Sequence, residues 1–215
     1  MSQVNYKNEI KIRIIPEIYD AALIYKNNMV GRTFMYVFNG KYIEVTYKTE
    51  NFKHLTGIPS RLTPNEFYYQ AIERTIEKEQ IKDFDNRHPY DLAKKKLKHL
   101  LNLYNMSSSE CFMQVDITTE TETYKFGTTN LKFSILLTED IDSYGIKKSE
   151  KYISQSLRPK DCFEKSSDVY DVTHIFVKYN NEKKYKNVTY SSINELPECV
   201  EGKIDESVKQ YYKFV

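Results

Sequence analysis

The second half of the chain alternates apolar and polar side chains with a period of two residues, and this alternation limits the possible folds more than any other feature of the sequence. The alternation is carried by short segments rich in aromatic and β-branched residues, which are 112–115, 124–126, 131–135, 152–157, 172–178 and 184–190. The polar turn sequence 179–182 separates the last two of them. We therefore expect the chain after residue 111 to form a mostly antiparallel sheet.

A second strand pattern lies nearer the N-terminus. Aromatic and branched residues on both sides of Asn39-Gly40 predict a β-hairpin between Arg32 and Tyr47, because Asn-Gly is a two-residue turn that hairpins favour. Before this hairpin, apolar residues at helical spacing after Pro16 predict a short helix. At the far end of the chain, a closing helix is expected over residues 204–212.

Two further helices are expected between the hairpin and the sheet. The sequence Thr63-Pro64-Asn65-Glu66 is typical of a capping box and predicts a helix that runs to about residue 82. Pro89 is expected to open a second helix, with an apolar face against the core. The opposite face of this helix is expected to carry three lysines, Lys94, Lys95 and Lys98.

Helices followed by a run of strands indicate an α+β fold rather than alternating α/β units. We expect helices packed against a mostly antiparallel sheet, preceded by an N-terminal helix and the β-hairpin. The sequence contains no internal repeat and no long linker, so a single globular unit is expected.

The charges of the chain nearly cancel, because 32 Lys and Arg residues face 30 Asp and Glu residues and the net charge is +2. An anionic partner would therefore have to be held by a local patch, since the whole chain exerts little long-range attraction. Only six of the basic residues are arginine, whose planar guanidinium suits bidentate contacts better than a lysine ammonium does. The position of each arginine is therefore informative.

Several common classes of protein are disfavoured by what the sequence lacks. It has no glycine-rich phosphate loop, no His-Glu-x-x-His and no Gly-x-Ser-x-Gly, and its four histidines do not have metal-ligand spacing. No apolar run approaches the about 18 to 20 residues that span a bilayer, and the polar start at residues 1–5 lacks the order of a signal peptide. The three cysteines are far apart and are expected to be small buried residues. We expect a soluble cytoplasmic protein.

Two segments place polar groups that could perform chemistry among apolar neighbours. In an extended segment 51–58, His54 and Thr56 would share one face, and an imidazole beside a hydroxyl can transfer protons near neutral pH. Alternatively, His54 is a structural residue at the entry of the next helix. In the strand 152–161, the polar face would carry Tyr152, Ser154, Ser156 and Arg158. Arg158 beside the two serine hydroxyls could bind a phosphate, although a solvated sheet face is equally compatible with this pattern.

Two later segments are basic. Lys178 ends the apolar strand 172–178, where its ammonium could neutralise a phosphate in a transition state or could be an ordinary strand-end lysine. Residues 183–190 interleave basic and aromatic side chains, as in grooves that follow phosphates and stack bases. The alternative is a basic edge strand that resists aggregation.

Taken in order along the chain, these segments resemble a known family, the fourth group of phage-borne nucleases related to barnase, EndoU, the colicin RNases and RelE (the BECR superfamily). The resemblance is carried by Phe52-x-His54-Leu55-Thr56-Gly57-Ile58, Phe67-Tyr68, Lys96-Leu97-Lys98-His99-Leu100, the strand 152–161, and Ile175-Phe176-Val177-Lys178 followed by Tyr185. Where the family tends to have Pro-Asn before a hydroxyl residue, this sequence has Ser154-Gln155 before Ser156.

The resemblance implies an α+β fold in which helices pack against a twisted antiparallel sheet of about four strands. It also implies a metal-independent endoribonuclease without a cofactor, acting as a toxin or as a phage or mobile-element effector. The nuclease domain would span 32–190, between an N-terminal helical segment at 1–31 and a C-terminal tail or short helix at 191–215. The expected partners are RNA, a cognate antitoxin or immunity protein, and a host defence protein, in the cytoplasm of a bacterial host and without a membrane. The competing hypothesis is a non-catalytic phage or mobile-element protein that binds and inhibits a host defence protein or RNA.

The resemblance also implies a role for each candidate residue. The expected catalytic group has one imidazole, two hydroxyls, two cations and one phenol, which are His54, Thr56 and Ser156, Arg158 and Lys178, and Tyr185. The imidazole would move a proton, the hydroxyls would donate to phosphate oxygens, the cations would stabilise the developing charge, and the phenol would stack a base or position the phosphate. The residues expected to bind RNA are Lys160, Lys183, Lys184, Lys186 and Tyr190.

Overall fold

The structure is a computed structural model that describes residues 3–120 and 122–215. Met1 and Ser2, which begin the polar start noted above, lie outside the described residues. The helices are α1 (Gln3–Asn28), α2 (Asn51–Thr56), α3 (Pro64–Glu73), α4 (Tyr90–Leu100), α5 (Leu103–Met106) and α6 (Glu206–Lys209). The strands are β1 (Arg32–Phe38), β2 (Lys41–Thr46), β3 (Phe112–Thr118), β4 (Thr123–Thr129), β5 (Ser134–Ile141), β6 (Lys147–Arg158), β7 (Asp168–Tyr179), β8 (Asn187–Ser191), β9 (Glu195–Leu196) and β10 (Lys213–Phe214).

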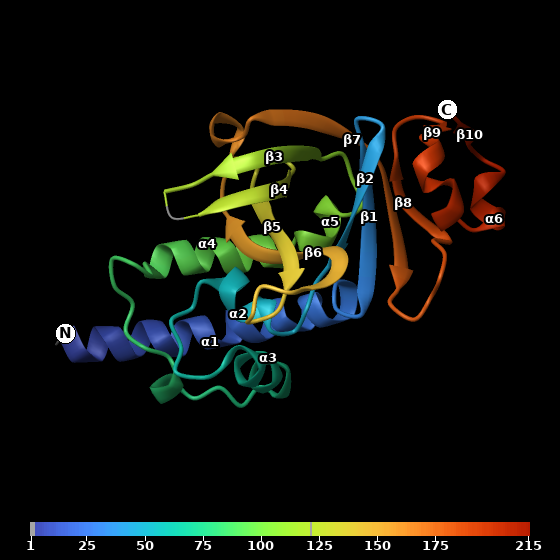
Figure 1. The fold of residues 1–215 in the computed structure, drawn as a ribbon. Helices are drawn as coiled ribbons and strands as arrows, with labels where there is room; N and C mark the ends of the chain where they lie inside the picture. The colour runs from blue at the N-terminus through green and yellow to red at the C-terminus, as the bar shows by residue number, and fades with distance from the viewer. Residues whose placement is uncertain (1–2, 121) are drawn as a thin grey trace.

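The main sheet closes into a barrel (Figure 1). Its strand order in the described chain is β1-β2-β6-β5-β4-β3-β7-β8, and β7 also pairs with β1, so that seven of the eight strands form a ring and β8 extends from β7. Neighbouring strands are antiparallel except β2 and β6, which run parallel and share the pairs Val45–Tyr152 and Thr46–Ile153. Closure leaves β8 at the border of the ring, where a strand has one side unpaired.

The barrel shows that the expectation of a twisted antiparallel sheet of about four strands, with the hairpin as a preceding unit, is wrong. The hairpin itself is present, with Phe38 opposite Lys41 across the Asn39-Gly40 turn. Its first strand, however, also pairs along its length with β7, from Arg32 opposite Tyr179 onward, and this contact closes the ring. A period of two residues indicates which side chains share a face, but it does not indicate which strands are neighbours.

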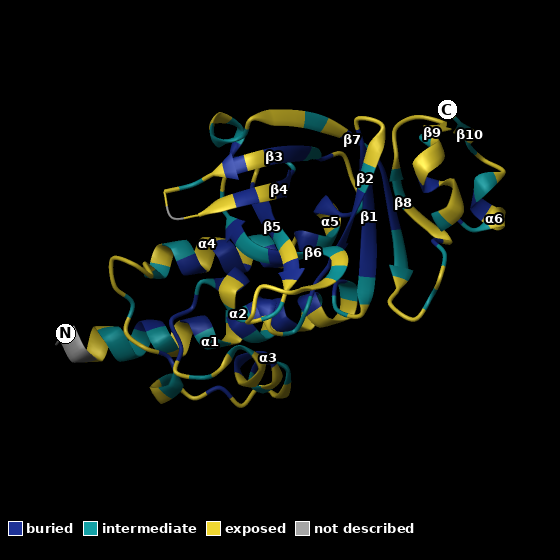
Figure 2. Cartoon of the chain, in the orientation of Figure 1, coloured by how far each residue is buried: buried dark blue, intermediate teal, exposed yellow. Residues whose placement is uncertain are grey.

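Strand β1 is buried on both faces, as Figure 2 shows by its dark blue colour. Phe34 and Tyr36 face the large core that the barrel shares with the helices, whereas Met35 and Val37 face a second core under the C-terminal segment. Helices α1, α2, α3 and α4 gather on one side of the barrel and the C-terminal segment lies on the other (Figure 1). This separation leaves two regions where side chains from several elements can meet.

The helices follow the sequence patterns with two differences. Helix α1 is much longer than the short helix expected after Pro16 and contains that proline, because buried residues such as Ile14 and Ile18 hold it against the core on both sides. The capping box of α3 is confirmed, since the Thr63 backbone N donates to the Glu66 carboxylate (2.8 Å) and the Thr63 hydroxyl accepts from Glu66 N. This helix ends before residue 82, because Arg74 adopts a left-handed conformation at φ 60°.

The C-terminal segment packs against the barrel rather than forming one helix. Apolar side chains of this segment cover the second core, and they are Leu196, Val200, Ile204 and Val208. The closing helix expected over 204–212 is only the single turn α6. Cys199 is exposed, contrary to the expectation of three buried cysteines, while Cys111 and Cys162 are buried. In the part of the chain that the structure describes, no helix combines the length and apolar character needed to cross a membrane.

Candidate active site

The segment that carries His54 is helical, not extended. Within α2, the side chains of His54 and Thr56 therefore do not share a face, and Thr56 is fully buried. The Thr56 hydroxyl donates to the carbonyl of Lys53 (2.7 Å) and accepts from the backbone N of Ile58 (3.1 Å), so it fixes the end of the helix. His54 is exposed at the molecular surface.

The turn after α2 makes room for a lysine of another helix. Gly57 ends α2 with φ +67°, and a Cβ at this position would lie 3.0 Å from Cδ and 3.2 Å from Nζ of Lys96. Lys96 lies on α4 and is only 8% exposed. Burial, followed by the charge of Arg158, lowers the pKa of Lys96 to about 8. A glycine at 57 thus allows the Lys96 side chain to lie directly against the end of α2.

Arg158 reaches the same region from the end of β6. A bulge at Gln155 sets Ser156 opposite Leu136 and Ser154 opposite Leu137, and because adjacent residues point to opposite faces, the two serines do so too. The expected polar face of this strand is therefore divided: Ser154 is fully buried, whereas Ser156 shares the face of Arg158. Arg158 Nε is buried without a hydrogen-bond partner among the described residues.

His54, Lys96 and Arg158 form what we call the cationic cluster. Burial, then the charges of Lys53 and Lys96, lower the pKa of His54, while Glu122 opposes this change. The Tyr124 hydroxyl donates to the Glu122 carboxylate (2.5 Å). Burial and the charge of Glu122 raise the pKa of Tyr124 to about 12, and Arg158 counteracts this change. Electrostatic contacts thus connect α2, α4, the start of β4 and the end of β6.

No member of the cationic cluster is neutralised by a carboxylate at close range. Throughout residues 3–120 and 122–215, none of the three side chains has an Asp or Glu oxygen within 4.0 Å. Holding the cations Lys96 and Arg158 close together without a counter-ion lowers the free energy of unfolding, because burial removes water from the charges and because like charges repel. Groups kept in such an unfavourable state are candidates for a binding or catalytic role, and their charge indicates an anionic ligand.

Lys96 is the member of the cluster that the sequence reasoning missed. The lysines around it, Lys94, Lys95 and Lys98, are exposed as expected. Lys96, however, follows Ala93 by three residues and precedes Leu100 by four, so it lies on the buried stripe of α4. A lysine on the apolar stripe of an amphipathic helix is therefore the sequence signal that could have identified Lys96 as a candidate site residue.

The structure places Lys178 and Tyr185 in a second group, beside the other core of the barrel. Tyr185 is fully buried and its hydroxyl donates to Glu44 Oε1 (2.7 Å), while Lys203 Nζ donates to Glu44 Oε2 (3.0 Å). Lys178 Nζ lies 4.6 Å from the centre of the Tyr185 ring and donates to the carbonyl of Lys183 (3.0 Å). Burial alone would raise the pKa of Glu44, but the hydrogen bonds from Tyr185 and Lys203 outweigh it and the pKa is lowered.

Replacing Tyr185 with phenylalanine should destabilise the fold, because the nearly buried Glu44 carboxylate would lose a hydrogen bond. A hydrogen bond to a charged group contributes about 1.5 to 3 kcal/mol, so we expect the free energy of unfolding to fall by about that amount. Urea unfolding followed by circular dichroism measures it. Tyr211→Phe, at a position 70% exposed, is the matched control and should unfold like the parent. Equal midpoints for Tyr185→Phe and Tyr211→Phe would contradict this account of Tyr185.

The residues expected to bind RNA are likewise divided between the two groups. Lys160 is exposed two residues beyond Arg158, near the cationic cluster. Lys183 and Lys186 are exposed on the turn between β7 and β8. Lys184 forms an ion pair, with its Nζ 3.6 Å from Glu206 Oε1. Tyr190 on β8 packs against the large core with part of its surface exposed. The candidate site residues therefore lie at two places, one formed by α2, α4 and β6 and the other by β7 and β8.

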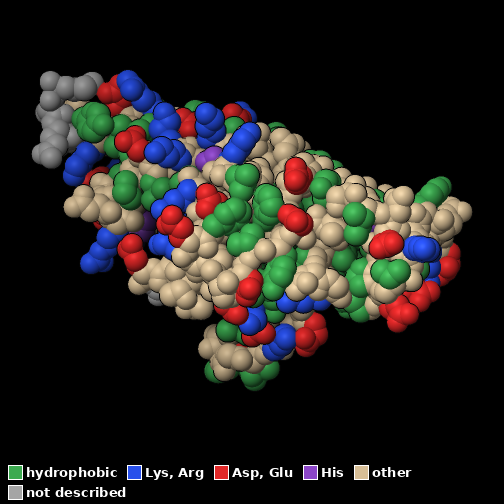
Figure 3. Space-filling view, turned by 90° about the horizontal axis from the view of Figure 1, so that it is seen from above, with side chains coloured by type: hydrophobic (Ala, Val, Ile, Leu, Met, Phe, Trp, Pro, Cys, Tyr) green, Lys and Arg blue, Asp and Glu red, His purple; other side chains and the backbone are tan. Residues whose placement is uncertain are grey.

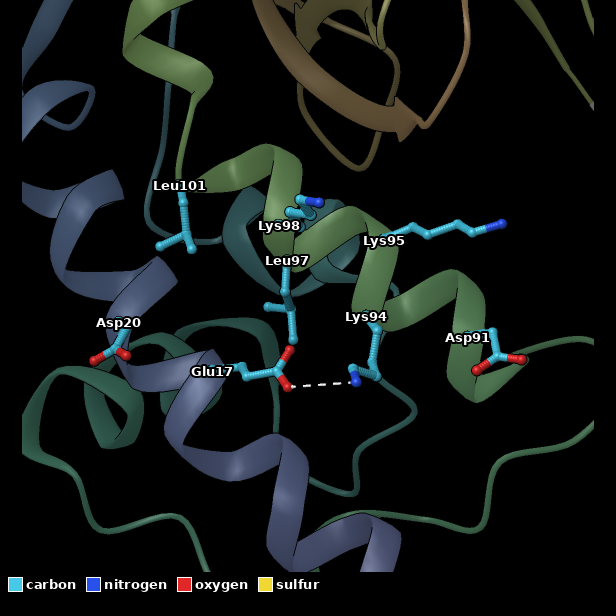
Figure 4. A pocket seen from close by; sticks show the side chains of 8 residues that line it. All are labelled: Glu17, Asp20, Asp91, Lys94, Lys95, Leu97, Lys98 and Leu101. Carbon is cyan, nitrogen blue, oxygen red and sulfur yellow. Dashed lines mark ion pairs between the residues drawn. The ribbon is translucent and has the colours of Figure 1, made fainter.

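The face of the molecule seen in Figure 3 has no single dominant charge, because basic and acidic side chains are interspersed on it. The groove of about 530 Å³ between α1 and α4 is an example: Lys94 extends across it to Glu17, with Nζ 3.9 Å from the carboxylate (Figure 4). Among the described residues, no group of three or more His, Cys, Asp and Glu side chains has the arrangement of a metal site. The cationic cluster is thus a local feature of a surface with mixed charge.

A comparison with protein families matches most of the chain. The model of the family described as phage-Barnase-EndoU-ColicinE5/D-RelE like nuclease4 (PBECR4) covers residues 17–194. No curated protein and no solved structure matches the chain. The matched range includes α2, α4 and β6, the elements that carry the cationic cluster.

Proposed function

Because the chain belongs to the PBECR4 family of phage-Barnase-EndoU-ColicinE5/D-RelE like nucleases, we propose that it is a metal-independent endoribonuclease that uses the cationic cluster as its active site. The 2'-hydroxyl of RNA would attack the adjacent phosphate, forming a 2',3'-cyclic phosphate and releasing a 5'-hydroxyl. The observation that supports this proposal most directly is that His54, Lys96 and Arg158 come together without a neutralising carboxylate. The RNA phosphate would be the missing counter-ion.

The three side chains match the three requirements of this reaction. A base must take the proton of the 2'-hydroxyl, and His54 suits this role because its lowered pKa keeps the imidazole neutral near pH 7. An acid must protonate the leaving 5'-oxygen, and Lys96, with a pKa of about 8, is protonated at neutral pH and able to release its proton. Arg158 would hold the non-bridging phosphate oxygens through paired N–H donors.

Neighbouring groups would assist this centre. Ser156 shares the face of Arg158 and would donate to a phosphate oxygen, and Lys160 would contact the next phosphate along the RNA. Thr56 would act only through its bonds to the end of α2, which hold His54 and Gly57 in place. The need for a 2'-hydroxyl makes RNA, and not DNA, the substrate.

Incubation of the purified protein with total RNA in EDTA, followed by mapping of the new ends, tests the proposal. We expect 2',3'-cyclic phosphate and 5'-hydroxyl ends, and no cleavage of a DNA of the same sequence. Lys95→Met removes an exposed lysine next to Lys96 and should leave cleavage intact, whereas Lys96→Met should abolish it. Cleavage that leaves 5'-phosphate ends, or equal cleavage of DNA, would contradict the mechanism. An inactive protein that binds a host protein tightly and stoichiometrically would favour the non-catalytic inhibitor instead.

A further inference from the structure

A groove at the end of α1 differs from its neighbours in charge. It has a volume of about 450 Å³ and lies between the end of α1, the start of β1, α5 and the strands β7 and β8. Its lining contains no Asp or Glu, and the cation that faces it is Arg32. Lys178 also borders the groove, but its ammonium lies on the other face of β7, against the Tyr185 ring. Four other grooves of comparable character in the described chain each include at least one carboxylate. This groove therefore differs from those four in having no negative charge in its lining.

The Arg32 guanidinium of the groove is free of close carboxylates. Arg32 forms no ion pair within 4.0 Å among the described residues. A carboxylate lies outside the lining, on the neighbouring turn, where Glu182 Oε2 accepts from the backbone N of Tyr179 (2.8 Å). Arg32 is thus the charge in the groove that an anion would neutralise.

An exposed aromatic ring stands at the rim of the groove. Tyr179 is 54% exposed, and the Arg32 guanidinium lies 5.4 Å from the centre of its ring. Arg32 and Tyr179 are paired residues of β1 and β7, so the two strands place their side chains on the same face of the sheet. A planar cation on a tyrosine presents a flat surface on which a base can stack. The amide side chains of Asn28 and Asn187, which also line the groove, can hydrogen-bond to base edges.

We propose that this groove, formed around Arg32 and Tyr179, binds one nucleotide of single-stranded RNA at a distance from the cleaved bond. The inference rests on the proposed function for the identity of the substrate. Single strands are bound by cations along the backbone together with aromatic rings under the bases, and both occur here. An acidic peptide would use the Arg32 guanidinium but would leave the tyrosine face and the amides without partners. The exposed Lys183 and Lys186 on the adjoining turn extend the basic surface along which the strand would run.

Binding of an RNA that cannot be cleaved tests this groove separately from catalysis. The probe is a fluorescent 2'-O-methyl hexauridylate, which lacks a free 2'-hydroxyl, and the readout is fluorescence anisotropy as a function of salt. Arg32→Ala combined with Tyr179→Ala should weaken binding about tenfold or more and reduce the salt dependence by about one ion. Arg87→Ala combined with Tyr144→Ala, which removes an exposed arginine and an exposed tyrosine elsewhere, is the matched control and should change binding less than about twofold.

Three outcomes would overturn the proposal. Unchanged affinity in the Arg32 and Tyr179 double variant, with urea unfolding like the parent, would show that the groove does not bind RNA. An equal loss of affinity for a 2'-O-methyl duplex would show a general electrostatic surface rather than a nucleotide site. Tight binding of an acidic peptide that competes with the probe, without any loss of probe binding in the double variant, would assign the groove to a protein.

Cleavage assays separate the failure of this inference from the failure of the proposed function. If the groove binds RNA, the double variant should raise KM for a long RNA and leave kcat/KM for a dinucleotide unchanged. Lys96→Met should lose cleavage, and adding Arg32→Ala and Tyr179→Ala to this variant should weaken probe binding by the same factor as in the parent. Loss of probe binding in the double variant, together with a parent protein that never cleaves RNA, would support the groove and reject the nuclease. Normal cleavage by the parent, together with unchanged probe binding in the double variant, would reject the groove alone.

Discussion

Replacing Lys96 with methionine is expected to stabilise the fold and to abolish RNA cleavage. Methionine keeps an unbranched side chain of similar length on the buried stripe of α4 but removes the charge. The pKa of Lys96 falls from 10.5 to about 8 in the folded chain, which corresponds to about 3 kcal/mol of unfavourable free energy for the charged form. Removal of that charge should therefore increase the free energy of unfolding by up to about 3 kcal/mol at pH 7, or raise Tm by roughly 6 to 12 °C.

The pH dependence of this stabilisation has a definite sign. Between pH 8 and 10.5 the unfolded chain still carries the Lys96 proton while the folded chain loses it, so the stability of the parent protein rises with pH in this window. Below pH 8 both states are protonated and the full penalty of burial is present. The amount by which the free energy of unfolding of Lys96→Met exceeds that of the parent should therefore be constant below about pH 8 and should disappear as the pH approaches 10.5.

Thermal unfolding of the parent, Lys96→Met and Lys95→Met between pH 6 and pH 10 measures these differences, and RNA cleavage at pH 7 gives the activity. Lys95 is exposed on the same helix, so its replacement should change neither quantity appreciably. A residue that lowers the free energy of unfolding and is also required for cleavage is typical of an active site, because catalysis can require a charged group in surroundings that destabilise the fold. Lys96→Met with reduced stability, or with full activity, would contradict the placement of Lys96 in the active site.

The fold could be predicted from the sequence only as far as its local elements. The Asn39-Gly40 turn and the capping box of Thr63 and Glu66 are determined by neighbouring residues, and both appear in the structure where the sequence indicates them. The ring is formed by the pairing of β1 with β7, which joins Arg32 to Tyr179, and by the two-residue parallel contact of β2 with β6. Such contacts depend on the global packing of strands, and no local pattern encodes them.

The arrangement of the candidate site residues follows from the sequence only in part. Residue type singles out His54 and Arg158, and the structure places Lys96, a residue of a lysine-rich helix, where its charge acts on His54 and the charge of Arg158 acts on it. The expectation that segment 51–58 is extended is wrong. The hydrogen bond of the Thr56 hydroxyl to the Lys53 carbonyl and the left-handed Gly57 belong to a helix end.

Replacing His54 with alanine should lower kcat/KM for RNA cleavage by about 10² to 10⁴ and should remove the acidic limb of the pH profile. In the parent, cleavage requires neutral His54, so activity should rise with pH along a limb whose midpoint lies below the ordinary histidine value of 6.5, because burial and the charges of Lys53 and Lys96 lower the pKa. Cleavage also requires protonated Lys96, so activity should fall with a midpoint at about pH 8. The two limbs together give a narrow bell centred near neutral pH.

Two further variants assign the limbs to these residues. His88→Ala removes an exposed histidine that lies 3.5 Å from Asp85, far along the chain from α2, and should keep both limbs. Lys96→Arg keeps the positive charge but does not lose its proton below about pH 12, so the alkaline limb should move out of the measured range even if the rate is low. An acidic limb that survives in His54→Ala would mean that another group accepts the proton, and the base would then have to be sought among the other groups around the cluster. If the alkaline limb were also unchanged in His54→Ala, Lys96 and Arg158 would keep their proposed roles, and only the role of His54 as the base would be rejected.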